Sequence, residues 1–195
     1  NIYRNETFVV GDLLYPLLME SNNAVAEQLA QYYGKSNFIN WMDATAKALD
    51  MSSTHFADAS GISPENISTT DDLYRLATYL ANKKSFILNI TRTPTKKISA
   101  SSGNTYHFDN FNVFSNSPNF IGGKVGQTSM TKETMMSVFS TSIGGTMRRV
   151  AIIVLRSDDY TTDTTKLTDW FIQSAQQGVV IASTACASCT RPPHY

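Results

Sequence analysis

The spacing of apolar residues changes near residue 85, and this change constrains the fold more than any other feature of the sequence. Before it, apolar residues recur every three or four positions, as they do along one face of an α-helix. After it, shorter apolar runs are separated by turn residues such as Gly103-Asn104 and Gly144-Gly145, which is typical of antiparallel strands joined by hairpins. Helical spacing returns over residues 165–175. This order predicts an α/β (α+β) fold, in which an antiparallel sheet carries helices on its faces.

Four helices are predicted before the change. The first two cover residues 11–19 and 23–33, and the second is expected to bury Val25, Leu29 and Tyr32 along one face. Ser36 is expected to cap the third helix, and Thr69 or Thr70 the fourth. Ser, Thr, Asp, Gly and Pro cluster between these two helices, so residues 52–69 are predicted to form a loop.

Extended segments are predicted after the change, at residues 86–90, 97–98, 120–127, 133–141 and 147–155. The last of them includes Val150–Leu155, a run that is apolar on both faces and therefore predicts a central strand. The closing helix is expected to bury Leu167, Trp170, Phe171 and Ser174.

Length and charge exclude several classes of protein. The chain has 195 residues, which predicts one domain, or one domain with a small subdomain. Because the last predicted helix ends near residue 175, the domain is placed over residues 1–178 and a tail over 179–195. Sixteen basic and sixteen acidic residues give no net charge, so the chain is not expected to bind nucleic acid. No apolar run is long enough to span a membrane. The two cysteines, Cys186 and Cys189, cannot complete a four-ligand zinc site, so no metal is expected.

Two short motifs contain candidate functional residues. Ser21-Asn22-Asn23 lies between two predicted helices, where such residues alone are typical of a helix cap. The stretch from Gly122 to Thr128 is predicted to be a strand and contains Lys124. Its glycines suggest a phosphate-binding loop, but the lysine is not followed by Ser or Thr as that loop requires.

Taken together, these motifs resemble those of the serine D-alanyl-D-alanine carboxypeptidases, the low-molecular-weight penicillin-binding proteins. That family has Ser-x-x-Lys, Ser-x-Asn and Lys-Thr-Gly in this order. The second and third correspond here to Ser21-Asn22-Asn23 and Lys124-Val125-Gly126. The resemblance extends over residues 2–175 and is strongest in five segments, 7–24, 54–61, 67–73, 120–128 and 167–171.

The resemblance implies a β-lactamase/transpeptidase-like fold, with a helical subdomain in addition to the sheet and its helices, and a reaction through an acyl-enzyme. Ser21 would pass a proton to the leaving amine, Asn23 would position the acyl chain, and Lys124 would supply positive charge. The strand would pair with the substrate, which implicates Gly123, Val125, Gly126, Gln127 and Thr128 in substrate binding, with close backbone approach at the glycines and an oxyanion donor in the N–H of Gln127.

The resemblance also implies partners and a location. The substrate would be the stem peptide of peptidoglycan, β-lactams would inhibit the complete enzyme covalently, and no cofactor would be needed. The protein would act outside the cytoplasmic membrane, in the periplasm or at the cell surface.

The nucleophile of the first motif is the main departure from the family. No Ser-x-x-Lys precedes Ser21, so the nucleophile is expected to lie outside these 195 residues. One Ser-x-x-Lys occurs later, from Ser129 to Lys132. It is expected to lie in a loop between two strands, and a catalytic Ser–Lys pair needs one turn of helix to place both side chains on one face.

Two further departures concern the carboxylate of the substrate. Val125 stands where the family has Thr and removes a hydroxyl donor. The segment from Ser157 to Asp163 is acidic where the family tends to place Arg. Both put strict carboxypeptidase specificity in doubt and leave endopeptidase or transpeptidase activity open. Two alternatives of another kind also stay open: a non-catalytic relative that binds peptidoglycan peptides or a protein, and a β-lactamase-like hydrolase.

Overall fold

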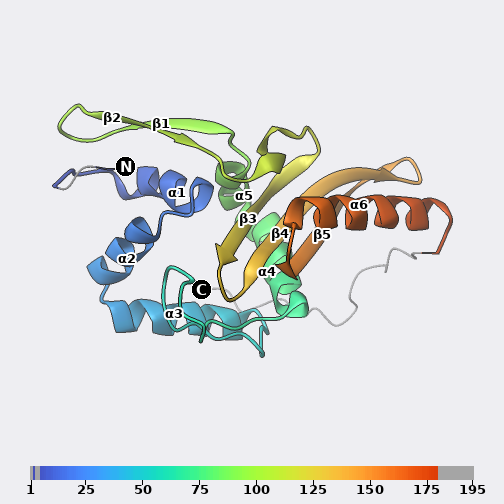
Figure 1. The fold of residues 1–195 in the computed structure, drawn as a ribbon, viewed down its shortest axis with the longest axis horizontal. Coiled ribbons are helices and arrows are strands. Elements are labelled where there is room, and N and C mark those ends of the chain that lie inside the picture. The colour runs from blue at the N-terminus through green and yellow to red at the C-terminus, as the bar shows by residue number, and fades with distance from the viewer. Residues whose placement is uncertain (1, 3–4, 180–195) are drawn as a thin grey trace.

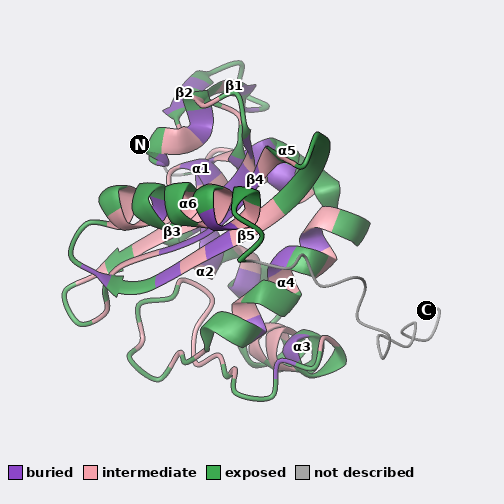
Figure 2. Ribbon diagram, turned by 90° about the vertical axis from the view of Figure 1, so that its right-hand side faces the viewer, coloured by how far each residue is buried: buried purple, intermediate pink, exposed green. Residues whose placement is uncertain are grey.

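A three-stranded antiparallel sheet lies between helices on both of its faces (Figures 1 and 2). The computed structural model describes residue 2 and residues 5–179. The strands β3 (Phe120–Thr128), β4 (Lys132–Ile143) and β5 (Thr146–Ser157) are neighbours in that order, and glycines 144 and 145 form the hairpin between the last two. The predicted α/β (α+β) architecture is therefore present.

Helices precede the sheet along the chain and are followed by a closing helix. The first three are α1 (Val10–Met19), α2 (Asn23–Tyr32) and α3 (Lys35–Ala48). They form an arm beside the sheet (Figure 1). The next two, α4 (Thr70–Lys83) and α5 (Ser85–Thr91), cover one face of the sheet, and α6 (Tyr160–Gln176) covers the other.

Each face of the sheet has its own hydrophobic core. On one face, Leu88 of α5 and Ala77 and Leu80 of α4 pack against Met136 and Val138 of β4. On the other, aromatic and aliphatic side chains of all three strands form a cluster with Phe114 of the short helix η1 (Val113–Asn116) and Tyr160 of α6. Burial on both faces fixes the register of the strands, because a slip by one residue would exchange the two sets of side chains.

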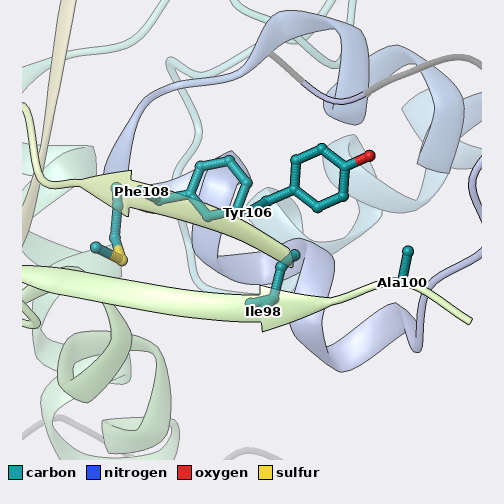
Figure 3. Close-up of a cluster of buried hydrophobic side chains, with 5 residues drawn as sticks. Ile98, Ala100, Tyr106 and Phe108 are labelled. Carbon is teal, nitrogen blue, oxygen red and sulfur yellow. The ribbon is translucent and has the colours of Figure 1, made fainter. Parts of the chain in front are cut away.

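A separate hairpin of β1 (Thr95–Ser99) and β2 (Thr105–Asp109) packs against α1. Ile98, Tyr106 and Phe108 project from the hairpin on one side, and they bury Met19 at the end of α1 (Figure 3). The turn at Gly103-Asn104 is where the sequence predicts it, and Gly103 has a φ of 90°. This hairpin and its cluster hold the C-terminal end of α1 in place.

Residues 86–90 were predicted to be extended and are helical, so this prediction is wrong. The segment forms α5, in which Leu88, Ile90 and Thr91 are buried. This helix contacts β3, α1 and α4. A short apolar run fits both a strand and a buried helix, and only its packing partners distinguish the two.

The position predicted for Val150–Leu155 is also wrong. β4 is the central strand of the described sheet, and β5 lies at an edge. β5 is apolar on both sides because α4 contacts one face of the sheet and α6 the other, not because strands flank it.

Several predictions about helix ends and faces need correction. Gly34 stands at the N-cap of α3, and Ser36 lies inside its first turn. Tyr32, Leu167 and Trp170 are exposed, although the apolar spacing predicted that they would be buried. The cap predicted at Thr69 is confirmed, since its side chain accepts a hydrogen bond from the N–H of Asp72. The loop over residues 52–69 is confirmed apart from one bridge between His55 and Ile67.

Some predictions lie partly or wholly outside the described residues. Cys186 and Cys189 belong to this group, and the division into a domain over 1–178 and a tail over 179–195 stays a prediction. Over the part of the chain that the structure describes, no helix is long and apolar enough to cross a membrane. In the same residues, no group of His, Cys, Asp and Glu side chains is arranged to hold a metal ion.

The close packing of α5 on β3 predicts a strong effect of Gly122→Ala. A Cβ atom at Gly122 would lie 2.6 Å from the carbonyl oxygen and 2.8 Å from the Cα of Leu88, and the φ of 153° is one that L side chains rarely adopt. Because the backbone of α5 must move, we expect the variant to lose about 2 kcal/mol or more of unfolding free energy in a urea titration.

Gly11→Ala is the matched control, since no atom lies within 4 Å of its added Cβ. It is expected to keep or slightly raise stability, because alanine favours a helix by up to about 1 kcal/mol over glycine. Equal stability of the two variants would contradict the packing described for Gly122.

Candidate active site

Ser21 lies at the corner between α1 and α2, in a strained backbone conformation. Its φ is 55°, in the left-handed region that residues other than glycine seldom adopt. The corner is held on both sides: the N–H of Asn22 donates to the carbonyl of Pro16 in α1, and the Oδ1 of Asn22 accepts from the N–H of Val25 in α2. The two helices thus fix the direction of the Ser21 side chain. Such strain is often found at functional sites.

Lys124 in β3 reaches Ser21 across 103 positions of sequence. Its Nζ donates to the Oγ of Ser21 at 2.8 Å and to the carbonyl oxygen of Val125. The two motifs singled out in the sequence therefore meet. Burial lowers the pKa of Lys124 from its usual value to about 8. A lysine with such a pKa is still largely charged at neutral pH, and it can release a proton more readily than an exposed one.

One end of β3 has its outer edge covered. The N–H of Gly123 donates to the Oγ1 of Thr91 in α5 at 3.0 Å, so it points away from β4. Backbone groups of alternate residues in a strand point to the same side. The backbone groups of Val125 and Gln127 therefore also point outward, which agrees with the hydrogen bond from Lys124 to the carbonyl of Val125.

This alternation makes the second half of β3 suitable for binding an extended peptide. β3 is the first strand of the described sheet, with β4 on one side only. An edge strand presents unpaired N–H and C=O groups that can pair with an added strand. The N–H of Gln127, assigned to an oxyanion by the resemblance, is one of the groups that face outward.

The remaining predicted residues lie around this edge. Asn23 begins α2 and is exposed. Val125 is half-buried and packs against the cluster of Phe120, Met135 and their neighbours. Thr128 ends β3, where its hydroxyl accepts from the N–H of Thr131 at 3.0 Å. Asn23 thus begins the helix that follows Ser21, and Thr128 ends the strand that carries Lys124. Among the described residues, neither side chain forms a hydrogen bond with Ser21 or Lys124.

Gly123 and Gly126 are also required by packing within the sheet. A Cβ at Gly123 would lie 2.4 Å from the carbonyl oxygen of Met136 in β4, and one at Gly126 would lie 2.9 Å from the Oγ1 of Thr134. The backbone that comes close is therefore that of β4, within the protein. Packing against β4 alone is enough to require glycine at both positions. Close approach of a ligand would be an additional role.

The later Ser-x-x-Lys does not form a catalytic pair. Ser129 lies in the turn between β3 and β4, and Lys132 begins β4 with a φ of 55°. The Nζ of Lys132 binds Asp158 at 2.8 Å. The prediction that this motif lies in a loop between strands is confirmed, and its lysine is engaged by a carboxylate.

The acidic segment from Ser157 to Asp163 is used within the fold. Asp159 caps α6 by accepting from the N–H of Thr162 at 3.0 Å, and Asp163 accepts from the hydroxyl of Ser157. Hydrogen bonds from Thr162 lower the pKa of Asp159. These aspartates therefore have structural partners, and their negative charge remains beside the sheet.

Thr91 is the residue that sequence reasoning missed. It is buried, its hydroxyl donates to the carbonyl of Leu88, and it accepts from the N–H of Gly123. It thereby sets the orientation of β3 just before Lys124. The sequence contains no motif at Thr91, and its role depends on α5 being a helix, which the periodicity did not predict.

A family model described as D-alanyl-D-alanine carboxypeptidase matches residues 1–159. A D-alanyl-D-alanine endopeptidase of Pseudomonas aeruginosa is 34% identical over 124 residues, which cover 62% of this chain and 38% of the relative. An endopeptidase of the same name from Escherichia coli is 36% identical over 97 residues, or 49% of this chain and 31% of the relative. The matched part is thus well under half the length of these curated relatives.

Solved structures agree with the family. A penicillin-binding protein of Listeria monocytogenes, in its cefotaxime-bound form, superposes with a TM-score of 0.70 at 28% identity over 86% of this chain and 66% of that one. A D-alanyl-D-alanine carboxypeptidase of Mycobacterium tuberculosis gives a TM-score of 0.68 at 25% identity, over 85% and 65% of the two chains. The β-lactamase/transpeptidase-like fold predicted from the sequence is confirmed. The chain belongs to the D-alanyl-D-alanine carboxypeptidase family.

Proposed function

We propose that this chain forms the substrate-binding part of a serine peptidase that cleaves peptide bonds next to D-alanine in the stem peptides of peptidoglycan. The family and its relatives support a D-Ala-D-Ala peptidase-like function. The observation that carries the proposal is the contact of Lys124 with Ser21 beside the outward-facing backbone of β3. It brings a polar hydroxyl, a buried cation and a peptide-binding edge to one place.

The proposed reaction needs a nucleophilic serine from outside these 195 residues. Its oxygen attacks the carbonyl carbon of the scissile bond, and the N–H of Gln127 stabilises the oxyanion that forms. The lysine paired with that serine in Ser-x-x-Lys takes the proton of its hydroxyl, and when the C–N bond breaks this proton reaches the leaving amine through Ser21. Water hydrolyses the resulting ester, which releases the shortened peptide as a carboxylate. Charged Lys124 stabilises the negative charge of these states, because a buried cation acts through a low dielectric.

The supporting evidence favours an endopeptidase over a strict carboxypeptidase. Val125 offers no hydroxyl to a terminal carboxylate, and the aspartates of residues 158–163 make the neighbourhood less favourable for an anion. The two curated relatives described above are named endopeptidases. A substrate that continues past the scissile bond places less demand on carboxylate recognition.

One alternative has its own support. The described residues contain one Ser-x-x-Lys, and its lysine, Lys132, forms an ion pair with Asp158. A relative that binds peptidoglycan peptides without cleaving them would need only the open edge of β3. On either alternative the substrate lies outside the cytoplasmic membrane, and we propose the same location for the protein. β-Lactams are proposed as ligands, because related structures hold cefotaxime and ampicillin.

Fluorescent penicillin tests where the nucleophile lies. We expect this chain to give no covalent band on a denaturing gel, because neither Ser21 nor Ser129 has the helical Ser-x-x-Lys arrangement that acylation uses. A related penicillin-binding protein serves as the positive control. A covalent band that disappears in Ser21→Ala or Ser129→Ala would contradict the proposed position of the nucleophile.

The lowered pKa of Lys124 predicts pH-dependent binding. Below about pH 8 its ammonium is charged and attracts an N-acylated peptide ending in D-Ala-D-Ala, and above that pH the charge is lost. We expect the affinity, measured by calorimetry, to fall about tenfold between pH 7 and pH 9.5.

Lys124→Met is the control for this titration. It should bind the peptide weakly, with no change over the same pH range. An affinity of the unaltered chain that stays constant across pH 8 would contradict the role given to Lys124.

Val125→Thr tests the proposed preference for an endopeptidase substrate. Thr has nearly the shape of Val and would restore a hydroxyl donor, at some cost in stability because Val125 packs against the apolar cluster of Phe120 and Met135. We expect about tenfold or more tighter binding of a peptide with a free terminal carboxylate, as one added hydrogen bond to a charged group provides. Binding of the same peptide with a terminal amide should not change. Equal gains for both peptides would refute the carboxylate argument.

A further inference from the structure

Four aromatic side chains meet at the corner where α2 is followed by α3, and we call this group the aromatic corner. It consists of Tyr32 and Tyr33 at the end of α2, and Phe38 and Trp41 in α3. Tyr32 is 77% exposed, Trp41 55% and Tyr33 45%. Apolar spacing predicted Tyr32 in the core, but it lies outside the three hydrophobic core clusters. An exposed apolar cluster of this kind commonly marks a binding surface.

The rings of the aromatic corner hold one another in place. The ring of Tyr33 stacks with that of Phe38 at 6.3 Å between centroids, and it meets the edges of Tyr32 at 5.0 Å and Trp41 at 6.1 Å. Such offset and edge contacts are the favourable geometries for aromatic pairs. The rings therefore form a platform that is ordered before any ligand binds, which reduces the entropy lost on binding.

The surroundings of the aromatic corner are polar. Gln31, Asn37 and Asn40 are exposed and are close to the aromatic residues in the sequence, and Lys35 forms an ion pair with Glu27 at 2.8 Å. Protein–protein interfaces usually have an apolar centre that excludes such groups. Flat rings next to amides instead match a sugar ring, which presents one face of C–H groups and a rim of hydroxyl and acetamido groups.

The distance from the candidate active site gives the second argument. α2 begins at Asn23 in the site and reaches Tyr32 nine residues later, which is about 14 Å at the rise of an α-helix. An extended peptide of four residues spans about the same length. A stem peptide that lies with its D-alanine end beside β3 is therefore long enough to place the sugar at its other end near the aromatic corner.

We propose that the aromatic corner binds amino-sugar rings of the glycan strand, so that the protein takes stem peptides that are still attached to glycan. This proposal rests on the proposed function for the identity of the peptide. Binding of the glycan itself depends only on the aromatic corner and is measured separately.

The chain has two tryptophans, and both are exposed to a similar degree, which gives a matched pair of reporters. Trp170→Phe leaves Trp41 in the aromatic corner as the only tryptophan, and Trp41→Phe leaves Trp170 on α6. The probe is a peptide-free strand of alternating N-acetylglucosamine and N-acetylmuramic acid. We expect a saturable change in emission from Trp41 and none from Trp170. No saturable change at Trp41, or equal changes in both variants, would overturn the proposal.

Affinity variants provide a second measurement. Trp41→Ala and Tyr32→Ala are each expected to weaken glycan binding about tenfold, whereas Trp170→Ala should leave it unchanged. Circular dichroism checks that the variants are folded. If the two variants of the aromatic corner instead abolish a concentration-dependent dimer seen by sedimentation, while glycan binding is absent, the surface binds a second copy of this chain and the proposal is wrong.

The two proposals fail in different ways. Lys124→Met should weaken peptide binding and leave binding of the peptide-free glycan intact. Glycan binding without any binding of D-Ala-D-Ala peptides would refute the proposed function and support the aromatic corner. Peptide binding without glycan binding would do the reverse. If both hold, a stem peptide attached to glycan should bind about tenfold tighter than the free peptide, and Trp41→Ala should remove that difference.

Discussion

The contact between Lys124 and Ser21 is the interaction on which the candidate active site depends. It joins the arm of α1 and α2 to the first strand of the sheet, two parts that are 103 residues apart in the sequence. The position of each side chain depends on contacts outside its own helix or strand. Ser21 needs the corner that Pro16 and Asn22 fix, and Lys124 needs β3 in its register with β4. Burial of the ammonium then lowers its pKa, so the same packing that builds the site also sets its charge.

The orientation of β3 follows from its contact with α5. Thr91 accepts a hydrogen bond from Gly123, and the absence of side chains at Gly122 and Gly123 lets α5 and β4 approach from two sides. This contact also occupies the beginning of the strand edge, so an added peptide has access only from about Lys124 onward. The structural glycines and the proposed substrate groove are therefore consequences of one packing arrangement.

The order of elements and the two motifs could be predicted from the sequence, because both depend on residues close together in the chain. The hairpins at Gly103-Asn104 and Gly144-Gly145 and the cap at Thr69 are of this kind. Residues 86–90 were misassigned because a short apolar run has no clear period, and the role of Thr91 was missed with them. The edge position of β5 could not be read from its composition either, since covering helices make an edge strand as apolar as a central one.

A site that contacts only the end of the substrate beside β3 would bind that substrate with low affinity. Val125 removes a donor for a terminal carboxylate, and the nearby aspartates are already committed to α6 and to Lys132. Binding energy from a distant part of a substrate can position its reacting bond as effectively as contacts beside that bond. A peptide that is anchored by its glycan at the aromatic corner would meet the edge of β3 at high local concentration. The proposed loss of carboxylate recognition and the proposed remote binding surface would therefore complement each other on substrates that are part of a polymer.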